Sequence, residues 1–162
     1  MAYLREGHWR PLAVSGCRRF GHDDPVTDIR LATPDDLGEL SGKDHLPAAE
    51  LAAILDRSRV LVAEDAGRDG VVGWLRWGLF WDEVPFMYLL HVEASRRGQG
   101  LGRLLVGEWE RTCARAGHDT VMTSTVSAES AQHFYRKLGY VDAGCLLLPG
   151  EPAELFFIKQ IA

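Results

Sequence analysis

A glycine-rich stretch between an apolar run and an amphipathic segment constrains this chain more than any other feature. The sequence RRGQGLGRLL, residues 96–105, places Gly98, Gly100 and Gly102 at alternate positions. Glycine adopts backbone conformations closed to other residues and lets a ligand approach the main chain closely. The first N–H groups of a helix lack partners and carry partial positive charge. A glycine loop at the start of a helix therefore predicts an anion site that suits a diphosphate.

Two common nucleotide-binding loops do not match this stretch. The phosphate loop of NTPases needs the pattern GxxxxGK[ST], and the residue five after Gly98 is Arg103. The dinucleotide fingerprint GxGxxG would begin at Gly98 and Gly100, and it also requires a glycine where Arg103 stands. Both readings are therefore excluded.

The residues around this loop predict strands interspersed with helices. Thr33 is expected to cap a helix with Pro34 at its first position, and Pro47 is expected to open a second helix to about Arg57. The stretch 86–92 is apolar nearly throughout, which predicts a strand near the sheet centre, covered on both faces. Strands are expected at 28–32, 59–65, 71–81, 86–92, 119–126, 140–147 and 155–159.

Two further helices carry apolar stripes at helical spacing. One follows the glycine loop to about Ala116, and the other is expected to have Ser127 as its cap and to end at Gly139. The first stripe comprises Leu101, Leu104, Leu105, Trp109 and Cys113. The second stripe comprises Ala131, Phe134, Tyr135 and Leu138. Both helices are therefore expected to pack on the sheet through these stripes.

Two motifs, in this order, resemble those of the GNAT superfamily of acyl-CoA-dependent N-acyltransferases. The first is Arg97, two residues, Gly100, one residue and Gly102, preceded by LLHV and followed by an amphipathic helix. The second is AQHFYRKLGY, residues 131–140, which is similar to the cofactor helix of that family. The resemblance extends from about Ile29 to Lys159 and includes the segment IRLATPDDL.

The resemblance implies an α+β (α/β) fold. Its expected form is a mixed central sheet of about six to seven strands, splayed in the middle and flanked by about four helices. At 162 residues the chain suits one domain, which we place at residues 28–162. Residues 1–27 show no sustained periodicity, and we interpret them as an N-terminal extension that is either mobile or packed across the domain.

In this family, acyl-CoA lies in the gap where the strand before the glycine loop and the strand after its helix splay apart. By resemblance, the pantetheine arm would pair with the edge of Leu90 to Val92, as an added strand would. The diphosphate would meet the main chain of the glycine loop, with Arg97 and Arg103 as side-chain partners. The residues expected to bind acetyl-CoA are Leu90, Val92, Arg97, Gly98, Gln99, Gly100, Leu101, Gly102, Arg103, Ala131 and Tyr135.

Acetylation of an amine needs a base for the amine, a donor for the oxyanion and an acid for the departing thiolate. The resemblance implies Tyr135 as the acid and the backbone N–H of Val92 as the oxyanion donor, although Tyr135 also fits an ordinary core stripe. Candidates for the base are His91, Glu93, Asp82 and Glu83. Their alternatives are a hydrogen-bonded core histidine and a solvated loop carboxylate. Glu83 and its neighbour Asp82 could also bind an acceptor cation.

Aromatic residues crowd the segment before and within the central strand. They could wall an acceptor pocket or fill the sheet core, and they comprise Trp74, Trp77, Phe80, Trp81, Phe86 and Tyr88. One departure from the family pattern is Ala128, because many members have an asparagine three residues before the alanine that corresponds to Ala131. We expect this change to alter contacts with pantetheine and to leave the diphosphate site intact.

The composition narrows the classes of function. A net charge of −5 and a pI near 5.6 argue against nucleic acid or an anionic membrane surface as a partner. The three cysteines form no CxxC pair and the six histidines show no metal-ligand spacing. We therefore expect no disulfide framework, no metal site and a reducing, cytoplasmic location.

The leading hypothesis is an N-acetyltransferase that transfers an acetyl group from acetyl-CoA to a primary amine of a small molecule or a protein. The amine would attack directly in a ternary complex. The alternative is a catalytically silent CoA-binding module with a regulatory or interaction role, suggested by Ala128 and by the unassigned base. A larger acyl donor and a homodimer are both compatible with the sequence.

Overall fold

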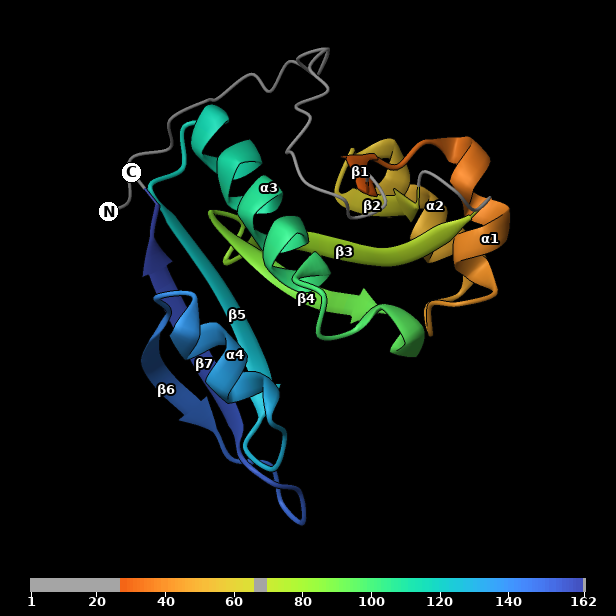
Figure 1. The fold of residues 1–162 in the computed structure, drawn as a ribbon. Helices are drawn as coiled ribbons and strands as arrows, with labels where there is room; N and C mark the ends of the chain where they lie inside the picture. The colour runs from red at the N-terminus through yellow and green to blue at the C-terminus, as the bar shows by residue number, and fades with distance from the viewer. Residues whose placement is uncertain (1–26, 66–69, 162) are drawn as a thin grey trace.

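In the part of the chain that the structure describes, seven strands form one mixed sheet and four α-helices lie on its two faces (Figure 1). The computed structural model describes residues 27–65 and 70–161. The expected fold class, a mixed sheet flanked by helices, is confirmed. The predicted extension at 1–27 lies outside the described residues, except for Thr27, which begins β1.

The strands are ordered β1-β2-β3-β4-β5-β7-β6, which places β4 at the centre as predicted. Neighbours are antiparallel except for β4 and β5, which are parallel and are connected through the crossover helix α3. The bounds are β1 Thr27–Leu31, β2 Val60–Asp65, β3 Val71–Phe80, β4 Val84–Val92, β5 Thr120–Val126, β6 Val141–Leu146 and β7 Glu154–Gln160.

The helices begin where the sequence provides caps. Thr33 forms a capping box with Asp36, whose carboxylate accepts the Thr33 N–H at 2.6 Å, and Pro47 precedes the second α-helix. The helices are α1 Leu37–Ser41, α2 Ala48–Asp56, α3 Leu101–Arg115 and α4 Ala131–Lys137, with short 3-10 turns at Pro34–Asp36 and Ala94–Arg96. Within the described ranges, the helices are too short or too polar for any of them to cross a membrane.

Two apolar clusters hold the helices against opposite faces of the sheet. The larger cluster lies under α3 and α4 and includes the fully buried Leu105, Trp109 and Phe157. The smaller cluster joins α1 and α2 to the other face through Leu51 and Trp74. Because burial of a large apolar side chain contributes about 1.5–3 kcal/mol, these clusters fix which helix covers which half of the sheet.

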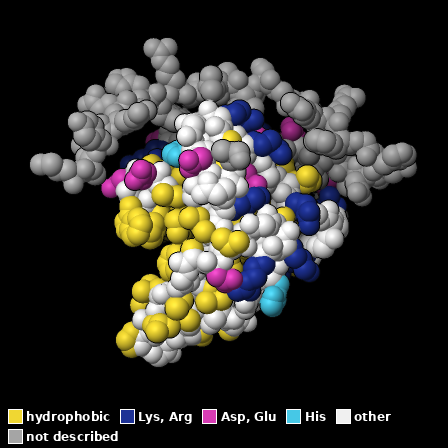
Figure 2. Space-filling view, turned by 90° about the vertical axis from the view of Figure 1, so that its left-hand side faces the viewer, with side chains coloured by type: hydrophobic (Ala, Val, Ile, Leu, Met, Phe, Trp, Pro, Cys, Tyr) yellow, Lys and Arg dark blue, Asp and Glu magenta, His cyan; other side chains and the backbone are white. Residues whose placement is uncertain are grey.

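The half of the sheet formed by β5, β7 and β6 keeps part of one face uncovered. Every residue of β6 is exposed. In Figure 2, hydrophobic side chains gather on one side of the molecule, and lysine and arginine side chains gather on the other. Among the residues whose burial is described, the large apolar ones that remain exposed are Trp81, Tyr88, Leu104, Val141, Leu146, Leu147 and Leu148.

Three sequence-based expectations need correction. Leu104 is 46% exposed, because it lies at the edge of the buried stripe of α3, whereas Val106 is buried in its place. Ser127 does not cap α4, since a turn follows β5 and the N-cap is Ser130. The central strand β4 is buried on its N-terminal side only, and from Tyr88 to Val92 it is half-buried or exposed.

Candidate functional site

The two central strands part in the middle of the sheet and form a fork. The parallel register of β4 and β5 comprises two pairs, Phe86 with Met122 and Met87 with Thr123. Beyond Met87 the strands diverge, as Figure 1 shows, with α3 and α4 on the near side of the opening. A bulge lies at the apex, because the register with β3 passes from Arg76–Leu89 to Trp77–Met87 and leaves Tyr88 without a partner.

The free edge of β4 presents main-chain groups to the opening of the fork. The N–H of Glu93 donates to the carbonyl of Val72 on β3 at 2.9 Å. Because backbone groups alternate in direction along a strand, those of Val92 and Leu90 point the other way, toward the gap left by β5. An extended ligand with amide groups can therefore add to this edge as a strand would.

The glycine loop joins this edge to the start of α3. Gly98 and Gly100 have φ values of 76° and 84°, which other residues adopt only with strain. The first main-chain bond of α3 runs from the N–H of Leu104 to the carbonyl of Gly100 at 3.1 Å. The N–H groups of residues 101–103 therefore have no acceptor within the helix.

The space beside Gly98 and Gly100 is open, so a ligand can approach the main chain there. A Cβ atom at Gly98 or Gly100 would have no protein atom within 4 Å, so protein packing does not account for either glycine. At Gly102 the nearest atom would be in the Phe134 ring, at an ordinary 3.5 Å. The loop thus leaves an open cradle of N–H groups, with the positive end of a 15-residue helix behind it.

Two arginines hold the loop in place. The Nε of Arg97 donates to the carbonyl of Val92 at 2.9 Å, so the exposed Arg97 links the loop to the free edge of β4. Arg96 lies 3.4 Å from the buried carboxylate of Asp65 at the end of β2. Gln99 also folds back, donating to the Ser95 carbonyl at 3.2 Å. The loop is therefore braced before any ligand arrives.

Tyr135 lies at the apex of the fork and is buried, at 6% exposure. Burial raises the pKa of its hydroxyl, and a hydrogen bond with the Thr123 side chain opposes that shift. The Thr123 hydroxyl in turn donates to the Met87 carbonyl at 3.1 Å. Tyr135 thus adjoins the point where the two strands separate, and its hydroxyl keeps its proton at neutral pH.

The two candidate bases, His91 and Glu83, lie in two other places. His91 is on the opposite face of β4, where its ring stacks on Trp74 with centroids 4.3 Å apart. Burial, and then the positive charge of Arg97, lower the pKa of His91, which favours the neutral ring. Glu83 is exposed in the turn before β4, at the end of the strand remote from the glycine loop.

The aromatic residues divide between the core and the surface. Trp74, Trp77 and Phe86 are buried, as the core interpretation predicted. Tyr88 is 53% exposed at the bulge, and its ring lies so close to Gly78 that a Cβ there would approach it within 2.6 Å. Because a bulge shifts the alternation of faces, the sequence pattern did not reveal that Tyr88 faces solvent.

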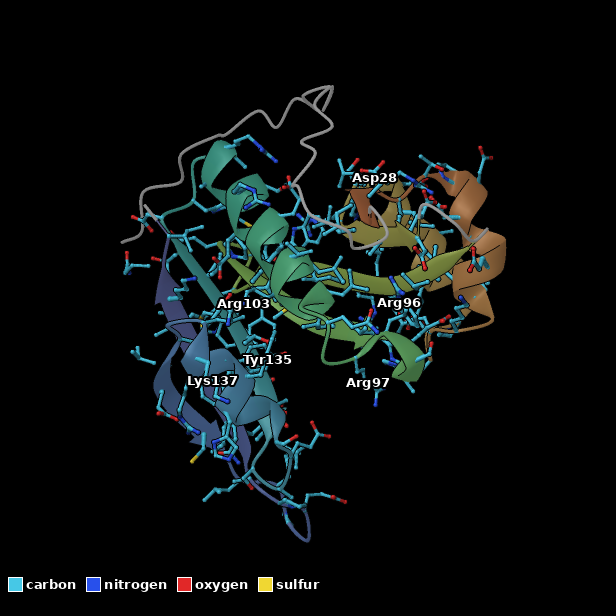
Figure 3. The ribbon with its side chains drawn as sticks, viewed as in Figure 1. Asp28, Arg96, Arg97, Arg103, Tyr135 and Lys137 are labelled. Atoms are coloured by element: carbon cyan, nitrogen blue, oxygen red, sulfur yellow. The ribbon has the colours of Figure 1, made fainter. Side chains whose placement is uncertain are left out.

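The structure brings nearly all of the predicted cofactor residues together around the fork. Leu90, the glycine loop and the cofactor helix meet there, since Gly102 lies near both Leu90 and Phe134. In Figure 3, Arg97 lies near the end of β4, whereas Arg103 and Tyr135 lie closer to each other, beside α4. Sequence reasoning missed Thr123, Arg96 and Asp65. The alternating pattern of the strand 119–126 was the sole sequence feature that pointed to Thr123. Such a pattern predicts the face on which a residue lies and does not predict which residue it contacts.

Comparison with known proteins agrees with this geometry. A family model described as an acetyltransferase (GNAT) domain matches residues 56–142. Ard1 from Thermoplasma volcanium is similar, with a TM-score of 0.70 and 18% identity over 84% of this chain and 98% of its own. A putative acetyltransferase, yncA of Salmonella typhimurium with its cofactor acetyl-CoA, has a TM-score of 0.69 and 17% identity, covering 85% and 95%.

A third similar structure is the ribosomal-protein-S18-alanine N-acetyltransferase from Escherichia coli. It has a TM-score of 0.68 and 15% identity, covering 85% of this chain and 95% of its own. Among curated proteins no sequence match is found. Because the family model spans more than half of the chain and contains both the glycine loop and the cofactor helix, the protein belongs to the GNAT family of acetyltransferases.

Proposed function

We propose that this protein is an N-acetyltransferase that uses acetyl-CoA to acetylate a primary amine of a small molecule or a protein. The observation that carries the proposal is the fork, where the free edge of β4, the N–H cradle of residues 98–103 and the buried Tyr135 surround one opening. When bound, acetyl-CoA supplies an acyl group activated as a thioester, with a thiol as leaving group. The residues present fit that ligand.

The roles of the β4 residues follow from their positions along the strand. Val92 and Leu90 both direct main-chain groups into the opening, and Leu90 lies about 7 Å closer to the apex. The Leu90 side chain is also close to Gly102, as is that of Phe134, the neighbour of Tyr135. We therefore propose the N–H of Leu90 as the oxyanion donor, in place of the N–H of Val92 that the resemblance implied. Val92 is then left to pair with the pantetheine arm.

Tyr135 is proposed to hold the proton that neutralises the departing thiolate. Its raised pKa keeps the hydroxyl protonated, as a donor requires. Thr123 orients that hydroxyl while remaining bonded to the Met87 carbonyl. Ala131, at the first position of α4 and packed against the core, holds the helix against the opening.

For the base we retain His91 and Glu83. His91 is neutral at pH 7, because burial lowers its pKa, so it can accept a proton through water from an amine on its face of β4. Glu83 and Asp82 are exposed beside Trp81 and can attract a cationic amine. The amine would approach from the face opposite α3 and α4, where Tyr88 is exposed.

A turnover assay tests the proposal. Acetyl-CoA is incubated with a broad panel of primary amines, and free thiol is measured with and without each acceptor. Thiol release that depends on an acceptor supports the enzyme. Binding of acetyl-CoA in calorimetry, without turnover on any amine, would favour the CoA-binding module suggested by Ala128. A cytoplasmic location and a homodimer remain predictions from the sequence.

A further inference from the structure

A second charged site adjoins the cradle. A surface cavity of about 260 Å³ lies between α3, the end of α4 and β7. Its charged lining residues are Arg103, Glu110, Lys137 and Lys159. Figure 3 shows Arg103 and Lys137 reaching toward the same region from α3 and α4. Arg103 belongs to both sites, because its N–H lies in the cradle and its side chain lines the cavity.

The charges of this cavity do not cancel. Glu110 accepts two hydrogen bonds from the Lys159 ammonium, at 2.7 and 2.9 Å, and one from the Tyr140 hydroxyl at 2.9 Å. Glu110 and Lys159 therefore neutralise each other. Arg103 and Lys137 are exposed, and within residues 27–65 and 70–161 neither makes an ion pair. The cavity thus carries two uncompensated positive charges.

We propose that Arg103 and Lys137 bind the 3′-phosphate of coenzyme A and make the protein selective for coenzyme A over its dephospho form. The inference rests on the proposed function, because it assumes that the diphosphate occupies the cradle at 98–103. The ribose then continues from the diphosphate on the side away from pantetheine. A phosphomonoester has a charge between −1.5 and −2 at pH 7, roughly equal and opposite to the charge of Arg103 and Lys137 together.

Calorimetry with two ligands tests this selectivity. Coenzyme A and dephospho-coenzyme A are titrated into the wild type, Arg103→Gln and Lys137→Gln, in buffers of low and moderate salt. We expect the wild type to bind coenzyme A roughly 10- to 50-fold more tightly than the dephospho form, less so as salt rises. Each substitution is expected to reduce that ratio about 3- to 10-fold while the dissociation constant for dephospho-coenzyme A changes less than twofold.

The control is Arg111→Gln, which removes an exposed cation on the same helix about 12 Å further along its axis. This variant is expected to retain the wild-type ratio. Thermal denaturation of all variants checks that each remains folded, as expected for exposed positions.

Two outcomes would overturn the assignment while leaving the proposed function intact. The first is equal binding of both ligands by the wild type. The second is an equal loss of affinity for both ligands on substitution, since Arg103 would then act on the diphosphate. If neither ligand binds the wild type, the proposed function itself fails.

Discussion

The two sides of the fork present different chemical groups. On the β4 side, the groups that face the opening belong to the main chain of Leu90, Val92 and the glycine loop. On the β5 and α4 side, the groups that adjoin the apex of the opening are the buried side chains of Tyr135 and Thr123. We therefore expect substitutions on the β4 side to act by changing the backbone conformation. On the β5 and α4 side, we expect the loss of one side-chain atom to be enough to change activity.

The strongest test of this difference between the two sides is Tyr135→Phe, which removes one oxygen atom on the β5 and α4 side. We expect kcat to fall roughly 100- to 1,000-fold, because loss of a positioned proton donor costs on that order. The dissociation constant for acetyl-CoA should change little. Steady-state kinetics and calorimetry measure the two quantities.

Tyr140→Phe is the matched control for that substitution. Tyr140 is also buried, and its hydroxyl bonds to Glu110 on α3 rather than to Thr123 in the fork. Both variants should lose about 1 kcal/mol of stability from a lost hydrogen bond. If kcat falls equally in both, or stays unchanged in Tyr135→Phe, Tyr135 has no catalytic role.

The backbone side is tested by Gly100→Ala. Gly100 has a φ of 84°, so an added Cβ forces the loop out of its left-handed conformation or strains it by about 1–2 kcal/mol. Reorienting the N–H groups would cost roughly two hydrogen bonds to charged oxygens, and we expect acetyl-CoA to bind about 100-fold more weakly in calorimetry.

Gly117→Ala separates strain from ligand binding. Gly117 has a similar φ of 91° beyond the opposite end of α3, with no atom within 4 Å of an added Cβ. This variant should lose a similar amount of stability and bind acetyl-CoA normally. Normal binding by both variants would contradict a main-chain cradle.

His91→Gln tests the face of β4 opposite α3 and α4. Because the folded-state pKa of His91 is lowered from 6.5, its contribution to stability is present above pH 6.5 and is lost as pH falls through the folded pKa. Urea denaturation measures the free energy of unfolding at pH 7.5 and at pH 5.5. Between these two values, the free energy of unfolding should fall less in His91→Gln than in the wild type. If His91 is the base, kcat should also fall roughly 10-fold at pH 7.5.

The comparison variant is His118→Gln. Burial also lowers the pKa of His118, which lies beyond the C-terminal end of α3. This variant should reproduce the pH effect on stability and leave kcat unchanged. Unchanged kcat in His91→Gln would exclude His91 as the base and leave Glu83 as the candidate to test by Glu83→Gln.

The smallest expected effect is a gain in affinity for acetyl-CoA on the β5 and α4 side of the fork. Ala128 is exposed in the turn before α4, and Ala128→Asn would add a polar group where the family pattern often has one. One new hydrogen bond to pantetheine should tighten acetyl-CoA binding about 2- to 10-fold in calorimetry. Ala116→Asn, at the end of α3, should have no effect, and equal behaviour of the two variants would contradict a contact at Ala128.

Much of the fold was predictable because its signals are local. Thr33 and Pro34 marked the capped turn before α1, and the unbroken apolar run around Met87 indicated the central strand. The stripe of α3 was predicted for Leu105 and Trp109 but was wrong for Leu104, whose exposure depends on how the helix is rotated over the sheet. Hydrophobic periodicity predicts the centre of a buried helix stripe well, but it does not determine whether a residue at the edge of the stripe is buried or exposed.

The sequence by itself determined the N–H cradle of residues 98–103, because glycine dihedrals and free helix N–H groups are properties of neighbouring residues. The tertiary structure alone decided that β4 and β5 part after Met87, that Thr123 meets Tyr135, and that Lys137 shares a cavity with Arg103. These contacts join residues on different strands and helices. They depend on strand pairing and helix packing across the whole domain, which no short stretch of sequence encodes.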